Sequence, residues 1–175
     1  MNVDRATLRE IKLLLLDVDG VLTDGSIHFD AEGRETKTFH VHDGAGLTYW
    51  HRAGFWSGFV SGRRAPVVEQ RAKELGVHEV HLGSLDKIAI LEEILARRGL
   101  PAQQVAYVGD DLVDLPVLAR VGFAVSVPNA RSEVRARAHH VTAVAGGAGA
   151  VREVVELLLR EKGLWQRLVD RGGVP

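Results

Sequence analysis

The sequence lacks cysteine, long apolar runs and an excess of charge of either sign. Without cysteine there is no disulfide bond and no thiolate chemistry, a composition that fits a reducing compartment. The longest early apolar run, residues 11–16, is interrupted by Lys12 and leads into Asp17 without a cleavage pattern. Because this run is too short to span a bilayer or to serve as a leader, we expect a cytoplasmic protein with no membrane partner.

The charge balance excludes a second class of partner. Lysine and arginine number 22 against 23 aspartates and glutamates, so the formal net charge is -1. Such a chain has no global positive field to hold nucleic acid or anionic lipid, and we expect no nucleic-acid partner.

With 46% apolar and 26% charged residues, the 175-residue chain has the composition and length of one globular domain. We therefore predict a single domain over residues 1–175.

Short apolar runs alternate with segments of helical period along the chain. The run at 11–18 is bounded by Asp19-Gly20 and is typical of a strand buried on both faces. Similar runs occur at 58–60, 79–82, 105–108, 123–127 and 140–144, and helical segments at 46–53, 65–75, 86–97, 112–121 and 132–138. This alternation implies right-handed crossovers and a parallel sheet. We predict an α/β, doubly wound, Rossmann-like fold with helices on both faces.

Residues 26–43 break this alternation. They show period-two patterning around the turn-like segment 30–33, which predicts a β-hairpin that projects from the sheet. His40 and His42 then share one strand face. No third ligand is apparent, so a polar strand face is favoured over a metal site.

The C-terminal region, residues 146–175, has a different character. A glycine-rich cluster opens it, and a helix is predicted from about residue 150 to 162, ending near Gly163. The last dozen residues look like a tail.

Polar side chains follow several of the predicted strands. In an open parallel sheet, reactive groups collect at the carboxyl ends of the strands. The candidates there are Asp17, Asp19, Ser61, Lys87, Asp110, Asp111 and Asp114. Taken singly, each has an ordinary structural explanation, because such aspartates cap turns and helices and a helix lysine is usually solvated.

The combination favours chemistry over structure. Carboxylates that converge on one sheet edge repel one another unless a cation lies among them. Oxygen ligands without cysteine suit Mg²⁺ better than zinc. The Ser61 hydroxyl, the Lys87 ammonium and backbone N–H groups near Gly20 and Gly62 supply a cradle for phosphate. The sequence therefore predicts phosphoryl transfer.

These residues resemble the four sequential motifs of the haloacid dehalogenase (HAD) superfamily phosphatases, in order and in spacing. The motifs are Asp17-Val-Asp19-Gly20-Val, Ser61-Gly62, Lys87 and Gly109-Asp110-Asp111. Longer stretches resemble the small, nearly capless family of 3-deoxy-D-manno-octulosonate 8-phosphate (KDO 8-phosphate) phosphatases: DVDGVLTDG (17–25), SGR (61–63), AYVGDDLVDLPVL (106–118) and GGAGAVRE (146–153). The similarity runs from about Lys12 to Leu159. Val21 stands where many superfamily members carry threonine, but valine is usual in this family.

The resemblance implies magnesium-dependent hydrolysis of KDO 8-phosphate to KDO and inorganic phosphate, in lipopolysaccharide precursor biosynthesis. Asp17 would be the nucleophile that forms an aspartyl-phosphate. Asp19 would protonate the leaving oxygen and later activate water. Mg²⁺ would be held by the carboxylates of Asp17 and Asp110 and by the backbone carbonyl of Asp19.

The remaining motif residues are implied to bind and position. Ser61 and Lys87 would hold the phosphoryl oxygens, together with the backbone at Gly20 and Gly62. Asp111 and Asp114 would stand behind them and hold Lys87 or metal-bound water.

Arg63 is the clearest sequence feature bearing on the substrate. The substrate of the resembling family carries a carboxylate, which an arginine beside the phosphate loop can grip with two hydrogen bonds. In phosphatases of nonulosonate (sialic acid or KDN) 9-phosphates, an acidic residue tends to follow the Ser/Thr-Gly pair. Arg63 therefore favours the eight-carbon sugar, and the nonulosonate 9-phosphate ester is the alternative. A surface arginine at a helix start is the structural explanation.

Other classes share part of this pattern. Phosphate-accepting receiver domains have the same fold class with an acidic cluster, a Ser/Thr and a Lys, but their phosphate acceptor follows the third strand, whereas Asp17 follows the first. A phosphosugar mutase is disfavoured because residues 26–43 are too few to form a cap.

The resemblance implies a homotetramer in which hairpins pack together and a neighbouring subunit, including its glycine-rich segment, helps cover the site. Ile27, Phe29, Phe39 and Val41 would give the hairpin an apolar face.

Overall fold

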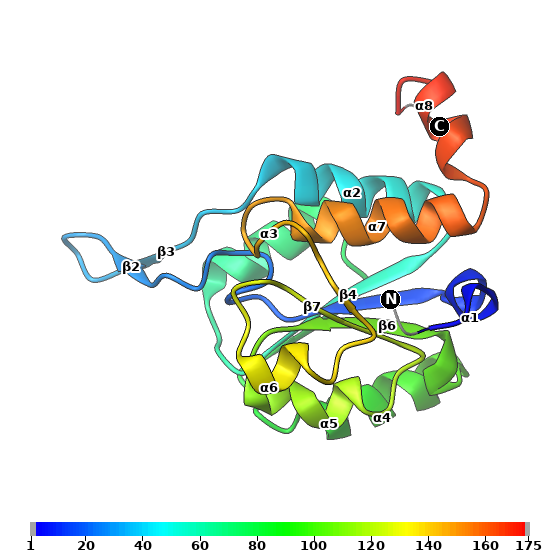
Figure 1. Cartoon of the computed structure of the whole chain (residues 1–175). Coiled ribbons are helices and arrows are strands. Elements are labelled where there is room, and N and C mark those ends of the chain that lie inside the picture. The colour runs from blue at the N-terminus through cyan, green and yellow to red at the C-terminus, as the bar shows by residue number, and fades with distance from the viewer. Residues whose placement is uncertain (1–2, 174–175) are drawn as a thin grey trace.

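A computed structural model describes residues 3–173 and shows a central six-stranded sheet (Figure 1). Its order is β5-β4-β1-β6-β7-β8, and every neighbouring pair is parallel. The strands are β1 (Leu13–Leu16), β4 (Trp56–Ser61), β5 (Glu79–Leu82), β6 (Val105–Gly109), β7 (Phe123–Ser126) and β8 (His140–Val141). The predicted parallel α/β sheet is confirmed, with small shifts at the strand ends.

Helices cover both faces of the sheet (Figure 1). One face carries α2 (Val41–Arg52), α3 (Pro66–Leu75) and α7 (Ala150–Glu161), and the other carries α4 (Lys87–Arg98), α5 (Leu115–Leu118) and α6 (Ser132–Arg135). Smaller elements are α1 (Arg5–Glu10), α8 (Trp165–Asp170) and the 3-10 turns Ala102–Gln104 and Leu112–Asp114. Among residues 3–173, no helix is long and apolar enough to cross a membrane.

The central strand β1 explains where the polar residues gather. Its four leucines are all buried, and it pairs with β4 on one side and β6 on the other. The chain moves outward from β1 through β4 to β5, then returns to the opposite side of β1 at β6. Ligands of doubly wound sheets bind at such a reversal, outside the carboxyl ends of the strands.

The insertion after β1 is a shorter hairpin than predicted. Its strands β2 (His28–Phe29) and β3 (Glu35–Thr36) pair antiparallel around a turn in which Asp30 N–H donates to the carbonyl of Arg34, 3.0 Å away. The ribbon projects from the end of the sheet where β1 stops (Figure 1).

The expectation of a hairpin strand reaching residue 43 is wrong, because α2 already begins at Val41. His40 is the residue that caps this helix, and its Nδ1 accepts a hydrogen bond from His42 N–H at 3.3 Å. The two histidines are therefore a helix cap and a helix residue and do not share a strand face. Buried Asp43 explains why this segment is a helix and not the predicted strand. Its Oδ1 accepts a hydrogen bond from the N–H of Arg152 at 2.8 Å, so a side chain of α2 caps the start of α7.

The C-terminal tail is also more ordered than predicted. Helix α7 ends as expected before Gly163, whose φ is +70°, but the chain then forms α8. Trp165 of α8 is buried, and the Arg152 guanidinium lies 5.2 Å from its ring and 4.8 Å from the ring of Tyr49. These cation–π contacts dock α8 against α7 and α2.

Candidate active site

Asp17 and Lys87 form an ion pair at the bottom of the site. Asp17 directly follows β1, and its N–H donates to the Val108 carbonyl of β6 at 2.9 Å, which fixes its backbone. Lys87 is the first residue of α4, and its Nζ lies 3.0 Å from Asp17 Oδ1. Both side chains are buried, which strengthens their attraction relative to a pair in water.

Asp114 holds the Asp17–Lys87 ion pair in place through hydrogen bonds. Its Oδ1 accepts hydrogen bonds from Lys87 Nζ at 2.7 Å and from the hydroxyl of Tyr107 at 2.6 Å. Its Oδ2 accepts from the backbone N–H groups of Asp110 at 2.9 Å and Asp111 at 3.1 Å. All of its partners are therefore donors of the protein itself, and its carboxylate positions both Lys87 and the Asp110 backbone.

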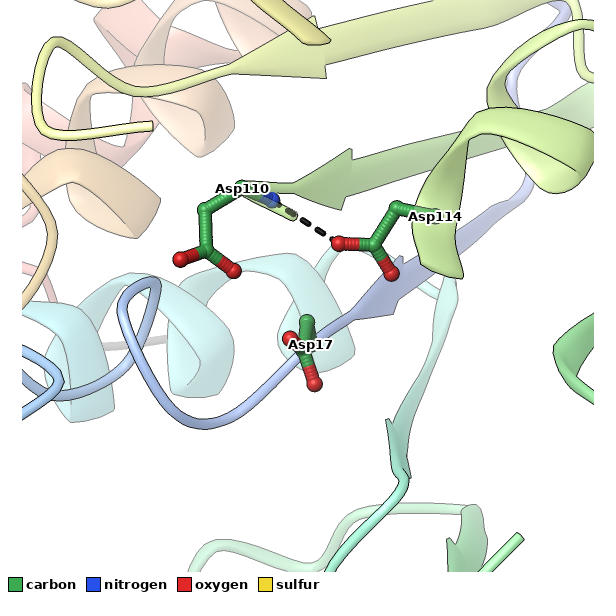
Figure 2. A group of neighbouring side chains, drawn as sticks. All are labelled: Asp17, Asp110 and Asp114. Carbon is green, nitrogen blue, oxygen red and sulfur yellow. Dashed lines mark hydrogen bonds between the residues drawn. The ribbon is translucent and has the colours of Figure 1, made fainter. Parts of the chain in front are cut away.

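Asp110 faces Asp17 across the end of the sheet. Figure 2 shows the carboxyl groups of Asp17, Asp110 and Asp114 turned toward one another. One oxygen from each lies within 4.8 Å of the others. Burial and the neighbouring Asp17 charge raise the pKa of Asp110 to about 8, and burial raises the pKa of Asp17 to about 6 against the opposing effect of Lys87. Such shifts are typical of buried carboxylates that lie close together.

The donor set fits a divalent cation. Asp110 Oδ1 is buried and has no hydrogen-bond partner among the described residues, whereas both oxygens of Asp114 are satisfied. Asp17 and Asp110 are therefore the carboxylates left to hold a cation. Oxygen ligands of this kind suit Mg²⁺.

Glycine at position 20 makes room for this approach. Gly20 has a φ of +89°, and a β-carbon there would overlap Asp110 Oδ2. Its carbonyl accepts a hydrogen bond from Asn129 Nδ2 at 2.8 Å, and Asn129 Oδ1 accepts from Gly146 N–H at 2.8 Å. Gly147 N–H also donates to the Val21 carbonyl at 3.0 Å. The glycine-rich segment thus packs against the loop that follows β1 of its own chain.

Ser61 and Gly62, at the end of β4, form another wall of the site. Ser61 is the last residue of β4 and is buried, and its Oγ accepts from Arg63 N–H at 3.1 Å. A β-carbon on Gly62 would lie 2.6 Å from the end of the exposed Leu85 side chain, which would have to move aside. An open pocket of about 340 Å³ results, lined by Asp17, Asp19, Gly25, Ser61, Gly62, Arg63, Leu85, Lys87, Asp110, Asp111 and Val113.

Asp19 lies in a second charged group at the pocket rim. Its carboxylate contacts Lys37 Nζ, and its Oδ2 lies 3.7 Å from Arg63 Nε. Glu35 lies 2.7 Å from Lys37 Nζ and 2.9 Å from Arg63 Nη2. Burial alone would lower the pKa of Lys37, but the two carboxylates outweigh it and raise that pKa above its ordinary value.

The sequence motifs did not include Lys37 and Glu35. Glu35 begins β3 and Lys37 directly follows it, two positions on, a spacing that places both side chains on one side of an extended chain. That spacing is the only sequence signal for these two residues, and it does not predict that their side chains point toward the pocket.

Asp111 is the one acidic motif residue that stands apart. Its exposed side chain caps the 3-10 turn after β6, with Oδ1 accepting from Leu112 N–H at 2.8 Å. Of Asp111 and Asp114, only Asp114 contacts Lys87 among the described residues, and a role of Asp111 toward metal-bound water stays a prediction.

Known proteins are similar to this chain in sequence and in fold. A family model described as haloacid dehalogenase-like hydrolase matches residues 75–154. The KDO 8-phosphate phosphatase of Yersinia pestis is 44% identical over 149 residues, which cover 85% of this chain and 80% of the relative. The Escherichia coli K12 phosphatase of the same name is 42% identical over 90% of this chain and 84% of its own.

Solved structures agree over nearly the whole chain. The Moraxella catarrhalis KDO 8-phosphate phosphatase, solved with a magnesium ion, a phosphate ion and KDO, superimposes with a TM-score of 0.94 at 39% identity and covers 96% of this chain and 97% of its own. The cobalt-bound Haemophilus influenzae phosphatase gives a TM-score of 0.90 at 38% identity, covering 95% and 98%. The chain therefore belongs to the KDO 8-phosphate phosphatase family of haloacid dehalogenase-like hydrolases.

Proposed function

We propose that this protein is a magnesium-dependent phosphomonoesterase that hydrolyses KDO 8-phosphate to KDO and inorganic phosphate. The observation that carries the proposal is the pair Asp17 and Asp110, with an unpartnered buried oxygen, beside the Lys87 ammonium in one pocket. The relative solved with magnesium, phosphate and KDO supports the same ligand set for this chain.

The residues divide the reaction among them. Asp17 attacks phosphorus, forms the aspartyl-phosphate and displaces the sugar oxygen. Asp19 gives that oxygen a proton and later takes one from the water that hydrolyses the intermediate. Lys87, held by Asp114, and Ser61 hold phosphoryl oxygens where negative charge is spread in the transition state.

The two facing carboxylates and the Asp19 backbone carbonyl would hold Mg²⁺. When bound, the ion neutralises the charge of the phosphate and of the carboxylates. Asp110 is fixed for this purpose at its backbone by Asp114 and has space beside Gly20.

Phosphate release from KDO 8-phosphate tests the function directly. We expect Mg²⁺-dependent turnover that stops when the metal is chelated. Asp17→Asn keeps the shape of the side chain but removes the nucleophile, so we expect a folded protein with turnover lower by about 1,000-fold or more. Wild-type-like activity in this variant would refute the role of Asp17, and isomerised sugar phosphate in place of free phosphate would indicate a mutase.

Arg63 is proposed to recognise the substrate carboxylate. Its side chain is 46% exposed at the pocket rim, and Glu35 orients the guanidinium from the hairpin side. Comparing kcat/KM for KDO 8-phosphate and a nonulosonate 9-phosphate separates the two substrate classes. A preference for the nine-carbon ester would overturn the assignment to KDO 8-phosphate.

The remaining proposals concern the setting of the enzyme. We propose that residues 1–175 act as one catalytic domain, that the enzyme works in the cytoplasm on its phosphorylated sugar, and that it assembles as a homotetramer through its hairpins. Exposed Ile27 and Phe29 on the hairpin and exposed Val41 at the start of α2 support the assembly, because exposed apolar side chains favour a partner surface. Phe39, which was expected on the same apolar face, instead packs against the core.

A further inference from the structure

The hairpin delivers a buried ammonium group to Asp19. Lys37 follows β3 on an otherwise exposed ribbon, yet its side chain is only 1% exposed. Its Nζ donates a hydrogen bond to Asp19 Oδ1 and lies 2.7 Å from Glu35 Oε1. Burying a lysine is costly unless its charge is paired, so these contacts hold all three side chains in one arrangement.

Arg63 closes this arrangement into a ring. Its Nη2 donates to Glu35 Oε2 at 2.9 Å, and its Nε lies 3.7 Å from Asp19 Oδ2. Each carboxylate of the charge ring (Asp19, Glu35, Lys37 and Arg63) therefore faces both cations. Lys37 is the stronger link, because Arg63 is about half exposed and solvent screens its attraction.

We propose that Lys37 is a positioning residue for Asp19, an inference that rests on the proposed phosphatase function. By engaging Oδ1, Lys37 holds the carboxyl group at the pocket wall. Asp19 Oδ2 accepts no hydrogen bond from the described residues and is the oxygen available to transfer a proton to the leaving group. As the ester P–O bond breaks and the bond to Asp17 forms, that proton passes to the leaving oxygen.

The dependence of rate on the leaving group tests this inference. The value of kcat/KM reports the steps up to P–O cleavage. In that cleavage p-nitrophenolate leaves without being protonated, whereas phenolate needs a proton from a general acid. In Lys37→Met we expect kcat/KM to fall about 10- to 100-fold for phenyl phosphate but less than about threefold for p-nitrophenyl phosphate. Lys37→Arg, which keeps the charge, should recover part of the loss.

Arg34→Gln is the matched control, since it removes a cation from the same hairpin. Arg34 is 74% exposed and pairs with Asp30 and Glu32, away from Asp19. Both esters should react at the wild-type rate. Equal losses for the two esters, or no loss, in a Lys37 variant that melts like the wild type would overturn the positioning role. Should Lys37→Met fail to fold, Lys37→Gln is measured against the same criterion.

The test separates this inference from the proposed function. A wild-type protein that hydrolyses neither aryl esters nor KDO 8-phosphate would refute both. A wild type active on aryl esters but not on KDO 8-phosphate would refute the substrate alone, while the Lys37 comparison would still decide the positioning role.

Discussion

At the residue scale, Gly20 controls how closely Asp110 can approach the loop after β1. We expect Gly20→Ala to abolish most activity, because the new methyl group would displace the Asp110 carboxylate. Gly33→Ala is the control: its φ is +76° as against +89° at Gly20, but nothing lies within 4 Å of the added carbon. It should cost about 1 kcal/mol of stability and leave phosphate release unchanged. Equal activity in the two variants would contradict this role of Gly20.

Asp114 offers a second residue-scale prediction. All its hydrogen-bond partners are donors, so in Asp114→Asn the amide NH₂ must face a donor whichever way it turns. We expect the free energy of unfolding to fall by about 2–4 kcal/mol and kcat to fall about 100-fold as Lys87 loses its support. Asp111→Asn, which keeps an equally good cap, should change stability by less than about 0.5 kcal/mol. Denaturant unfolding and phosphate release measure both effects.

The predictability of the site also differs from residue to residue. Ser61 ends a strand, Asp17 and Asp110 each follow one, and Lys87 begins a helix. A parallel sheet brings such positions together whatever the details of packing. Lys37 has no such rule, because a lysine is buried only when its partners come from elsewhere in the chain. Asp19, which accepts its hydrogen bond, lies 18 positions away.

At the element scale, His51 links the end of α2 to β4. Its Nε2 lies 2.6 Å from Ser57 Oγ, and burial, aided by the nearby His78, lowers the pKa of His51 to about 4 from 6.5. At pH values between these two pKa values, His51 is protonated in the unfolded chain but not in the folded chain. The free energy of unfolding therefore falls as the pH falls. From about pH 7 to pH 5 we expect His51 to account for a loss of about 1–2 kcal/mol.

His51→Gln removes this titration. Its free energy of unfolding should change less between the two pH values than that of the wild type. His42→Gln, at an exposed histidine of the same helix, should keep the wild-type slope. Urea unfolding at both pH values gives the comparison, and a wild-type slope in His51→Gln would exclude His51 as the source.

The elements were predictable wherever burial and period coincided. Continuous apolar runs marked the inner strands β1, β6 and β7, because strands buried on both faces have no alternating polar residues, whereas the edge strands β5 and β8 are partly exposed. The hairpin boundary was wrong because residues 37–42 alternate like a strand, while the helix start depends on the contact of Asp43 with α7. Helix α8 was missed because six residues give too short a period, and its stability comes from packing of Trp165.

At the scale of the whole molecule, the hairpin is expected to set the assembly state. Phe29 is 66% exposed on β2, and burying it against other subunits would remove apolar surface from water. We expect the wild type to scatter light as a particle several times the 19.1 kDa chain, and Phe29→Asp to scatter as a smaller one with an unchanged fold. Val169→Asp, an exposed apolar site on α8, is the control. A fully active wild-type monomer would refute the tetramer.

The central position of β1 also constrains the order in which the protein matures on the ribosome. The strand that leads to Asp17 is the first to be synthesised, yet its hydrogen-bonding partners β4 and β6 and the contacts from Asn129 and Gly147 all come later. Long-range pairings of this kind form only once both partners are available. Until about residue 147 has emerged, the loop after β1 therefore lacks these contacts, and we expect it to reach its folded arrangement only after that point.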